Sequence, residues 1–145
     1  LRKIDQVKNI KKTKFKGLLI IQGIKHKDSR GYLRELIVEK KIKKKFKFQI
    51  ISKSKKNVLR GLHFQFKKPQ GKYISVIKGE IFDVAVDIRK NSPTYKKIFT
   101  IRLSEKNSKS VYIPPGFAHG FLTLSKENII CYSCTEYRSV GNFDL

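Results

Sequence analysis

Methionine and tryptophan are absent from the 145 residues, cysteine occurs twice, histidine three times, and only 11 residues are acidic. Two cysteines cannot form the disulfide framework of a small secreted domain, so we expect a reducing, cytoplasmic setting. No apolar run approaches the ~18 residues of a membrane helix, which predicts no membrane partner. Residues 1–16 are basic and lack the apolar stretch of a secretory signal peptide.

Hydrophobic residues nonetheless make up 39% of the chain and aromatic residues 11%, which excludes an intrinsically disordered protein. A chain of this length buries roughly 68–70% of the surface of its unfolded form and can hold a core of its own. No low-complexity linker or internal repeat divides the sequence. We therefore predict a single domain over residues 1–145, with a basic N-terminal arm at about residues 1–16.

The most prominent feature of the composition is its charge, because 34 lysines and arginines give a net charge of +23. Such a charge attracts nucleic acids, anionic lipids and phosphorylated small molecules alike. The densest run, residues 40–47, is nearly all lysine and has Phe46 as its one aromatic, whereas nucleic-acid-binding surfaces favour arginine forks and interleaved aromatics. We expect a lysine-rich solvated surface and no nucleic-acid partner. The alternative, a nucleic-acid-binding protein, is tested by measuring DNA affinity at increasing salt concentration. Contacts to phosphates would give a steep negative slope of log affinity against log salt concentration.

Short segments with period-two alternation, separated by Gly and Pro, predict strands rather than helices. The expected strands are residues 18–24, 32–37, 46–52, 73–77, 81–87, 99–103, 110–113, 120–124 and 128–134. Only the lysine-rich segment after Glu39 favours a turn of helix. Nine or ten short strands in one domain indicate an all-β sandwich or barrel.

Histidine is the natural candidate for chemistry near neutral pH. His26 lies in a polar loop and is predicted to be at the surface. His63 and His119 each lie in an apolar, strand-like segment with glycine nearby, which favours a bulge or the close approach of a ligand. Either one alone could equally be a hydrogen-bonded core residue.

Two basic residues accompany His63. Strict alternation places Arg60 and His63 on opposite faces of one strand, so both can line one pocket only if the strand bulges at Gly61. A hairpin through residues 66–71 would return Lys72 alongside His63. An imidazole base with an ammonium and a guanidinium nearby suits a substrate that is anionic or becomes so.

Several long motifs follow one another in the chain. Arg60-Gly61-Leu62-His63-Phe64-Gln65 precedes Pro69, Gln70 and Lys72, and then come residues 79–89 (GEIFDVAVDIR), 92–95 (SPTY) and 114–121 (PPGFAHGF). Upstream, residues 28–35 read DSRGYLRE. With these motifs in this order and spacing, over about residues 17–137, the sequence resembles the dTDP-4-dehydrorhamnose 3,5-epimerase family.

This resemblance implies a jelly-roll, cupin-type β-sandwich, a homodimer, and a cofactor-independent isomerase of rhamnose biosynthesis for cell-surface polysaccharides. The implied substrate is a nucleoside-diphosphate 4-keto-6-deoxyhexose, converted as dTDP-4-dehydro-6-deoxyglucose is to dTDP-4-dehydrorhamnose. His63 would be the base and Tyr132 the acid that returns the proton, while Lys72 supports the enolate and the diphosphate. The other substrate contacts that the resemblance implies are Arg30, Glu35, Arg60, His119, Gln65, Ser52 and Arg138.

The sequence departs from the family in three places. Residues 48–54 read FQIISKS where the family has a Gln-x-Asn-x-Ser stretch, so Ser52 and Ser54 remain and the amide contacts are in question. Arg138 stands where the family has a second aromatic, although a guanidinium can also stack on a nucleobase. The aspartate that orients the family's base on a later segment has no counterpart in this sequence. The acids that could replace it are Asp83, Asp87 and Asp144.

Two metal-site patterns are present in part. Residues 114–119 look like the second cupin metal motif, but the first motif lacks its second histidine and its acid, so we predict no metal and no cofactor. Cys131 and Cys134 form a CxxC pattern that points to opposite faces of a strand, which predicts buried or half-buried thiols rather than a redox or zinc site. Two alternative functions stay open: an epimerase that acts on one carbon of another nucleotide sugar, and a non-catalytic sugar-binding cupin.

Overall fold

Strands make up nearly all of the regular structure in the computed structural model, which describes residues 7–139 and 143–144. The one short helix of this part of the chain, α1, spans Glu39–Ile42, as the sequence predicts. The strands are β1 (Val7–Lys12), β2 (Leu19–Gly23), β3 (His26–Asp28), β4 (Gly31–Leu33), β5 (Phe48–Lys55), β6 (Leu59–Phe64), β7 (Lys72–Lys78), β8 (Glu80–Asp87), β9 (Ile98–Ser104), β10 (Lys109–Ile113), β11 (Phe117–Thr123), β12 (Glu127–Cys134) and β13 (Phe143–Asp144). The predicted all-β class is confirmed.

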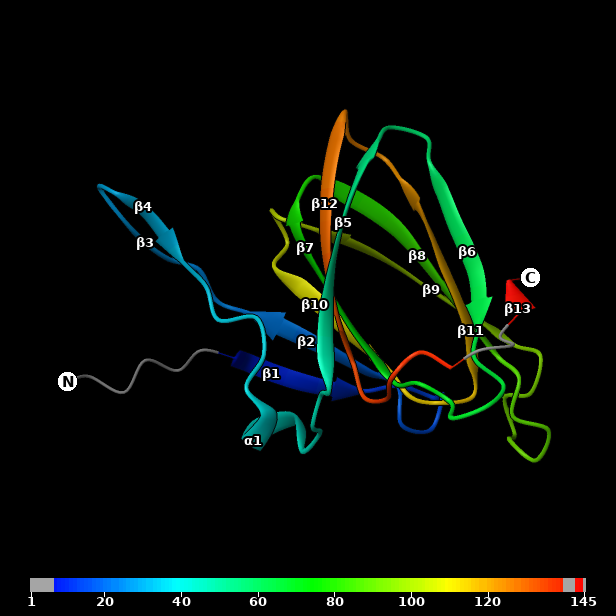
Figure 1. The fold of residues 1–145 in the computed structure, drawn as a ribbon. Helices are drawn as coiled ribbons and strands as arrows, with labels where there is room; N and C mark the ends of the chain where they lie inside the picture. The colour runs from blue at the N-terminus through cyan, green and yellow to red at the C-terminus, as the bar shows by residue number, and fades with distance from the viewer. Residues whose placement is uncertain (1–6, 140–142, 145) are drawn as a thin grey trace.

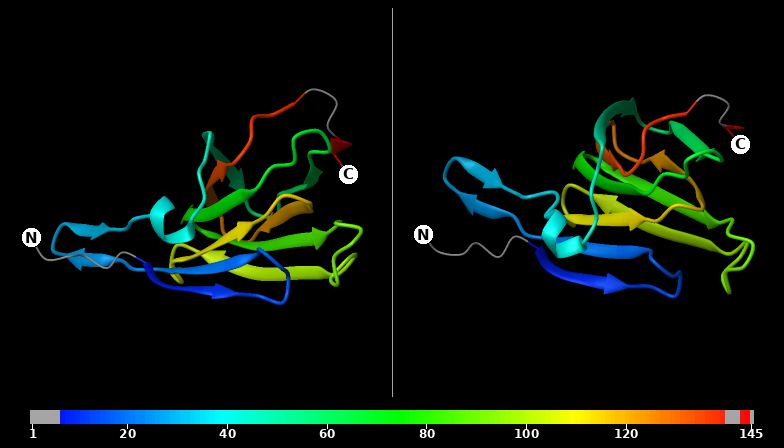
Figure 2. Two further views of the ribbon diagram at one scale, coloured as in Figure 1. Left: turned by 90° about the horizontal axis from the view of Figure 1, so that it is seen from below. Right: turned by 60° about the horizontal axis from the view of Figure 1, so that its bottom comes forward.

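The strands form two large antiparallel sheets that face each other as a sandwich (Figure 1). One sheet has the order β1-β2-β10-β7-β12-β5, and the other has the order β13-β6-β11-β8-β9. Strands β3 and β4 pair only with each other among the described residues, and this hairpin projects away from both sheets (Figure 2). No helix in the described part of the chain is long and apolar enough to cross a membrane.

The core between the sheets shows the alternation that defines a half-buried strand. On β8, Ile81, Asp83, Ala85 and Asp87 are buried, and the residues between them are partly exposed. Of these, Ile81 and Ala85 pack with Leu103, Val111, Ile113, Phe117 and Ile130 in one cluster. The sequence pattern alone did not say which face of β8 points inward, and the inward face is the one with two aspartates.

A second cluster lies on the outer face of the six-stranded sheet. Ile42 of α1 packs there with Ile21, Tyr73 and Tyr112. The chain reaches this face through residues 34–38, which were predicted to continue a strand from residue 32 to residue 37. That prediction is wrong beyond Leu33, where β4 ends and the chain becomes a connection held by bonds such as Tyr73 Oη donating to the Leu36 carbonyl (2.7 Å).

Two further expectations need correction. Residues 7–12 of the predicted N-terminal arm form edge strand β1, which pairs with β2, while residues 1–6 lie outside the described part of the chain. Strands β6 and β7 do not form the predicted hairpin, because each belongs to a different sheet. The connection between them crosses the sandwich, so Lys72 approaches His63 from the opposite sheet.

Candidate active site

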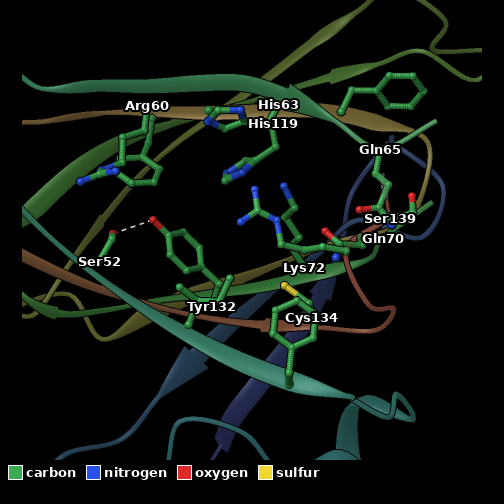
Figure 3. A pocket seen from close by; sticks show the side chains of 16 residues that line it. Ser52, Arg60, His63, Gln65, Gln70, Lys72, His119, Tyr132, Cys134 and Ser139 are labelled. Atoms are coloured by element: carbon green, nitrogen blue, oxygen red, sulfur yellow. Dashed lines mark hydrogen bonds between the residues drawn. The ribbon is translucent and has the colours of Figure 1, made fainter. Parts of the chain in front are cut away.

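A cavity of about 530 Å³ opens between the two sheets, where β5 and β12 face β6 and β11. It is lined by side chains from both sheets, as Figure 3 shows. Eight of the ten predicted site residues line it: Ser52, Arg60, His63, Gln65, Lys72, His119, Tyr132 and Arg138. Segments that are distant in the sequence therefore converge on one chamber of a size suited to a small ligand.

Arg60 and His63 reach the same cavity because β6 bulges between them, as the sequence required. His63 stands opposite His119 in the pairing of β6 with β11, whereas Arg60 stands opposite Phe121, so two residues of β6 face only Gly120. Gly61 lies in this bulge at φ +104°, and a Cβ there would lie 2.6 Å from the His119 carbonyl oxygen. Glycine at this position thus permits both the backbone conformation and the close approach of the strands.

His119 is held by a buried aspartate. Its Nε2 lies 2.8 Å from Oδ2 of Asp83, and the two side chains are only 4% and 0% exposed. A carboxylate can only accept a hydrogen bond, so Nε2 carries the proton of this pair. The position of His119 beside the cavity and its pairing with Asp83 distinguish it from an ordinary core histidine.

The three acids that could replace the family's aspartate lie at three different places in the fold. Asp83 pairs with His119, and Asp87 bonds to Arg89, Ser92 and Thr94, so these two of the three open alternatives do not pair with His63. Asp144 stands opposite His63 in the backbone register of β13 with β6. Its carboxylate lies outside the part of the chain that the structure describes.

Tyr132 points into the cavity across from His63 (Figure 3). Its hydroxyl lies 2.6 Å from Oγ of Ser52, on the neighbouring strand β5. Burial raises the pKa of Tyr132, and the Ser52 hydrogen bond and the charge of Arg60 offset only part of that rise. The phenol is therefore protonated at neutral pH, as a proton donor must be.

The cations of the cavity come from both sheets. Arg60 donates from Nε to Oγ of Ser54 at 2.9 Å, which fixes one edge of the guanidinium. Lys72 begins β7 on the opposite sheet and stands beside Cys134 in the β7–β12 pairing. The cavity thus holds positive charge on two sides, which suits an anionic ligand.

Two side-chain amides that line the cavity bond to neighbouring backbone segments. Gln65 donates from Nε2 to the carbonyls of Lys68 (2.6 Å) and Tyr137 (2.8 Å), and Gln70 donates to the carbonyl of Glu136 (2.7 Å). Gln65 was predicted to contact substrate, but its amide nitrogen donates to these two backbone carbonyls instead. The sequence did not indicate the bonds to Tyr137 and Glu136, because they join segments about 70 residues apart.

The cavity also has an apolar side that sequence reasoning did not identify. Phe48 and Ile50 of β5 line it, at the stretch where the sequence departs from the family's amides, together with Phe64 and Phe121. The Phe48 ring stacks on Tyr137, with centroids 6.1 Å apart and an interplanar angle of 10°. The departure at residues 48–54 is the signal that could have identified this surface.

Arg30 and Glu35, the other two predicted substrate contacts, do not line the cavity. Arg30 lies between β3 and β4 at the end of the projecting hairpin, where its guanidinium pairs with Asp28 at 2.6 Å and its side chain is 88% exposed. Glu35 follows β4 and is half-buried. His26, predicted to be at the surface, lies in β3 and is also half-buried.

The side chains that could bind a metal or act as thiol nucleophiles are few and scattered in the described residues. Across residues 7–139 and 143–144, no three His, Cys, Asp or Glu side chains gather closely enough to hold a metal ion. Cys131 and Cys134 are free thiols, half-buried and buried, as predicted. Burial raises the pKa of both thiols, so neither is activated as a thiolate.

Comparison with known proteins gives consistent results. The sequence model of the family described as dTDP-4-dehydrorhamnose 3,5-epimerase matches residues 12–142. The chain is 50% identical over 130 residues to the dTDP-4-dehydrorhamnose 3,5-epimerase of Methanothermobacter thermautotrophicus, covering 86% of this chain and 70% of that protein. It is 45% identical over 135 residues to the enzyme of that name from Salmonella typhimurium, covering 88% and 74% respectively.

Solved structures agree with the sequence relatives. The crystal structure of dTDP-6-deoxy-D-glucose-3,5-epimerase from Legionella pneumophila in complex with dTDP-4-keto-L-rhamnose matches with a TM-score of 0.89 at 40% identity. The match covers 94% of this chain and 77% of that one. The predicted jelly-roll, cupin-type sandwich is thereby confirmed.

Proposed function

The chain belongs to the dTDP-4-dehydrorhamnose 3,5-epimerase family, and we propose that it epimerises a dTDP-4-keto-6-deoxyhexose in the cavity between its sheets, using protein side chains alone. The substrate would be of the dTDP-4-dehydro-6-deoxyglucose type, and the product of the dTDP-4-dehydrorhamnose type. The observation that carries the proposal is the placement of His63 and Tyr132 on opposite sides of one cavity that also holds positive charge.

The reaction needs a base, an acid and a site for negative charge. A hydrogen beside a ketone is weakly acidic, so its removal requires a placed base and stabilisation of the enolate oxygen. In this proposal His63 takes the proton from carbon and becomes an imidazolium, while the charges of Lys72 and Arg60 stabilise the enolate and the diphosphate. Tyr132 then donates its proton to the opposite face of the carbon, which inverts the centre. The resulting phenolate and the imidazolium return to their starting forms by exchange with water.

We propose further that the active form is a homodimer in the cytoplasm. The β3–β4 hairpin projects from the sandwich with Tyr32 and Leu33 47% and 59% exposed, which supports a role in contact with a second copy (Figure 1). Arg30 and Glu35 lie outside the cavity of their own chain, so their predicted substrate contacts would require that second copy. Light scattering on the wild type and on Leu33→Asp, expected to be monomeric, tests the dimer.

The proposed cytoplasmic location is supported by the two free thiols, because unpaired cysteines are typical of a reducing compartment.

Solvent deuterium tests the chemistry. Incubated with dTDP-4-keto-6-deoxyglucose in D₂O, the wild type should place deuterium at both carbons beside the ketone and form the inverted sugar. His63→Ala should abolish this exchange and keep its affinity for dTDP within ~3-fold, because the base has no part in nucleotide binding. Exchange above about a tenth of the wild-type rate would reject His63 as the base. Exchange at one carbon would indicate a single-carbon epimerase, and nucleotide-sugar binding without exchange a non-catalytic binding protein.

A further inference from the structure

Two serines of strand β5 each hold one functional side chain of the cavity. Ser52 and Ser54 are two residues apart, so their side chains lie on the same face of the strand. Oγ of Ser52 lies 2.6 Å from the Tyr132 hydroxyl, and Oγ of Ser54 accepts a 2.9 Å hydrogen bond from Nε of Arg60. Tyr132 comes from the same sheet as the serines, whereas Arg60 comes from the opposite sheet.

We propose that Ser52 and Ser54 are positioning residues for two different steps of the reaction. Ser52 aims the Tyr132 hydroxyl for the return of the proton, and Ser54 aims the Arg60 guanidinium for binding of the anionic substrate. This inference rests on the function proposed above and divides that function between neighbouring residues of one strand.

The chemistry of the Ser52 contact favours one direction of its hydrogen bond. When Ser52 donates to the oxygen of Tyr132, the phenol keeps its own proton free to point at the substrate. After the proton has left, the same Ser52 hydroxyl donates to the phenolate and stabilises its charge, because a bond to a charged acceptor is stronger than a neutral one. The Ser52 bond also lowers the pKa of Tyr132 against the effect of burial, so loss of the bond makes the phenol a weaker acid.

Ser54 acts through Arg60. The Ser54 side chain does not line the cavity, and the residue is only 6% exposed. The bond that it accepts fixes Nε, and Nη2 of Arg60 makes a longer contact with the Lys53 carbonyl at 3.5 Å. A free arginine has many rotamers, so a fixed Nε reduces the entropy lost when the guanidinium meets an anion.

Each alanine variant is the matched control for the other, because Ser52→Ala and Ser54→Ala are the same chemical change on the same face of one strand. In D₂O, Ser52→Ala should raise the ratio of deuterated but uninverted substrate to inverted product ~10-fold, since the base still exchanges the proton while return from the opposite face slows. Its KM should rise less than that of Ser54→Ala, because Ser54 holds the guanidinium that binds the anionic substrate. Ser54→Ala should raise KM ~5–10-fold and leave that ratio unchanged.

Conservative variants separate positioning from packing. Ser52→Thr and Ser54→Thr keep the hydroxyl and should restore the wild-type ratio and KM, and melting temperatures show that each variant is folded. Equal effects of the two alanine variants on both quantities, or an unchanged ratio in Ser52→Ala, would overturn the inference and leave the epimerase function intact. A wild type that exchanges no deuterium would instead reject the proposed function, and the inference with it.

Discussion

Two aspartates of strand β8 invite a direct comparison. Asp83 and Asp87 lie four residues apart on the inward face, and both side chains are completely buried. Asp87 accepts hydrogen bonds from the backbone and guanidinium of Arg89 and from the hydroxyls of Ser92 and Thr94, at 2.6–3.0 Å. Asp83 accepts one bond, from His119, and its Oδ1 has no hydrogen-bond partner among the described residues.

The difference shows how one strand serves both the scaffold and the site. Asp87, Arg89, Ser92 and Thr94 form a cluster that holds the turn after β8 in place. Arg89 also connects this cluster to other segments, because it donates to the Lys16 carbonyl and lies over the Phe117 ring. Every strong acceptor position there is used, which is typical of a buried charge that stabilises a fold. Asp83 instead uses its one bond on a histidine that lines the cavity. We therefore expect the same substitution to affect stability at one position and turnover at the other.

The largest effect is expected at Asp87. Asp87→Asn removes the charge that Arg89 faces and disturbs the accepted hydrogen bonds, which should lower the free energy of unfolding by about 3 kcal/mol. For a chain of this size that corresponds to a fall of roughly 6–12 °C in Tm. Calorimetry measures the fall, and kcat of the protein that remains folded should stay within ~2-fold of the wild type. A Tm within about 2 °C of the wild type would remove the scaffold role of the cluster.

At Asp83 the expected effect is smaller in stability and appears in turnover. Asp83→Asn removes the charge next to His119 and permits the amide to donate instead of accept, which disturbs the tautomer of the imidazole. A small misplacement of a group in the site can cost about 100-fold in rate, so kcat should fall by up to about that factor. Steady-state kinetics and calorimetry on both aspartate variants make the comparison. If Asp83→Asn lowered Tm as much as Asp87→Asn and left kcat unchanged, the division between the two would be wrong.

Much of this arrangement follows from local patterns in the sequence. Period-two alternation located most of the strands, and Gly61 between Arg60 and His63 indicated the bulge that brings both to the cavity. These features depend on a few neighbouring residues, so a single sequence is enough to predict them. The motifs that surround the cavity are equally local and were identified as a set.

The remaining features depend on which strands become neighbours. The pairing of Asp83 with His119 requires that β8 lie beside β11. The hydrogen bond from Gln65 to the Tyr137 carbonyl requires that two segments distant in the sequence lie side by side. Hydrophobicity would place Phe82, Val84 and Val86 inward on β8, but the opposite face is the buried one. That face can be buried because Asp87 is held by Arg89, Ser92 and Thr94, and Asp83 pairs with His119. Strand β1 was not predicted, because its lysines interrupt the alternation of apolar and polar residues. Lysines are common on edge strands, where they prevent pairing with other chains.

The smallest expected effect tests the charge of Asp87 by pH. Burial alone would raise the pKa of Asp87, but hydrogen bonds from Arg89, Ser92 and Thr94 outweigh it and hold that pKa well below its usual value. A depressed pKa stabilises the fold fully above the unfolded-state value of about 3.9, and this contribution is lost as the pH falls below that value. The stability gap between the wild type and Asp87→Asn should therefore stay constant from pH 8 to pH 5 and narrow by about 1 kcal/mol between pH 4 and pH 3. Urea unfolding at each pH measures the gap, in which the carboxylates common to both proteins cancel. A gap as wide at pH 3 as at pH 7 would mean that the Asp87 charge contributes nothing, and that the difference between the two aspartates lies in packing alone.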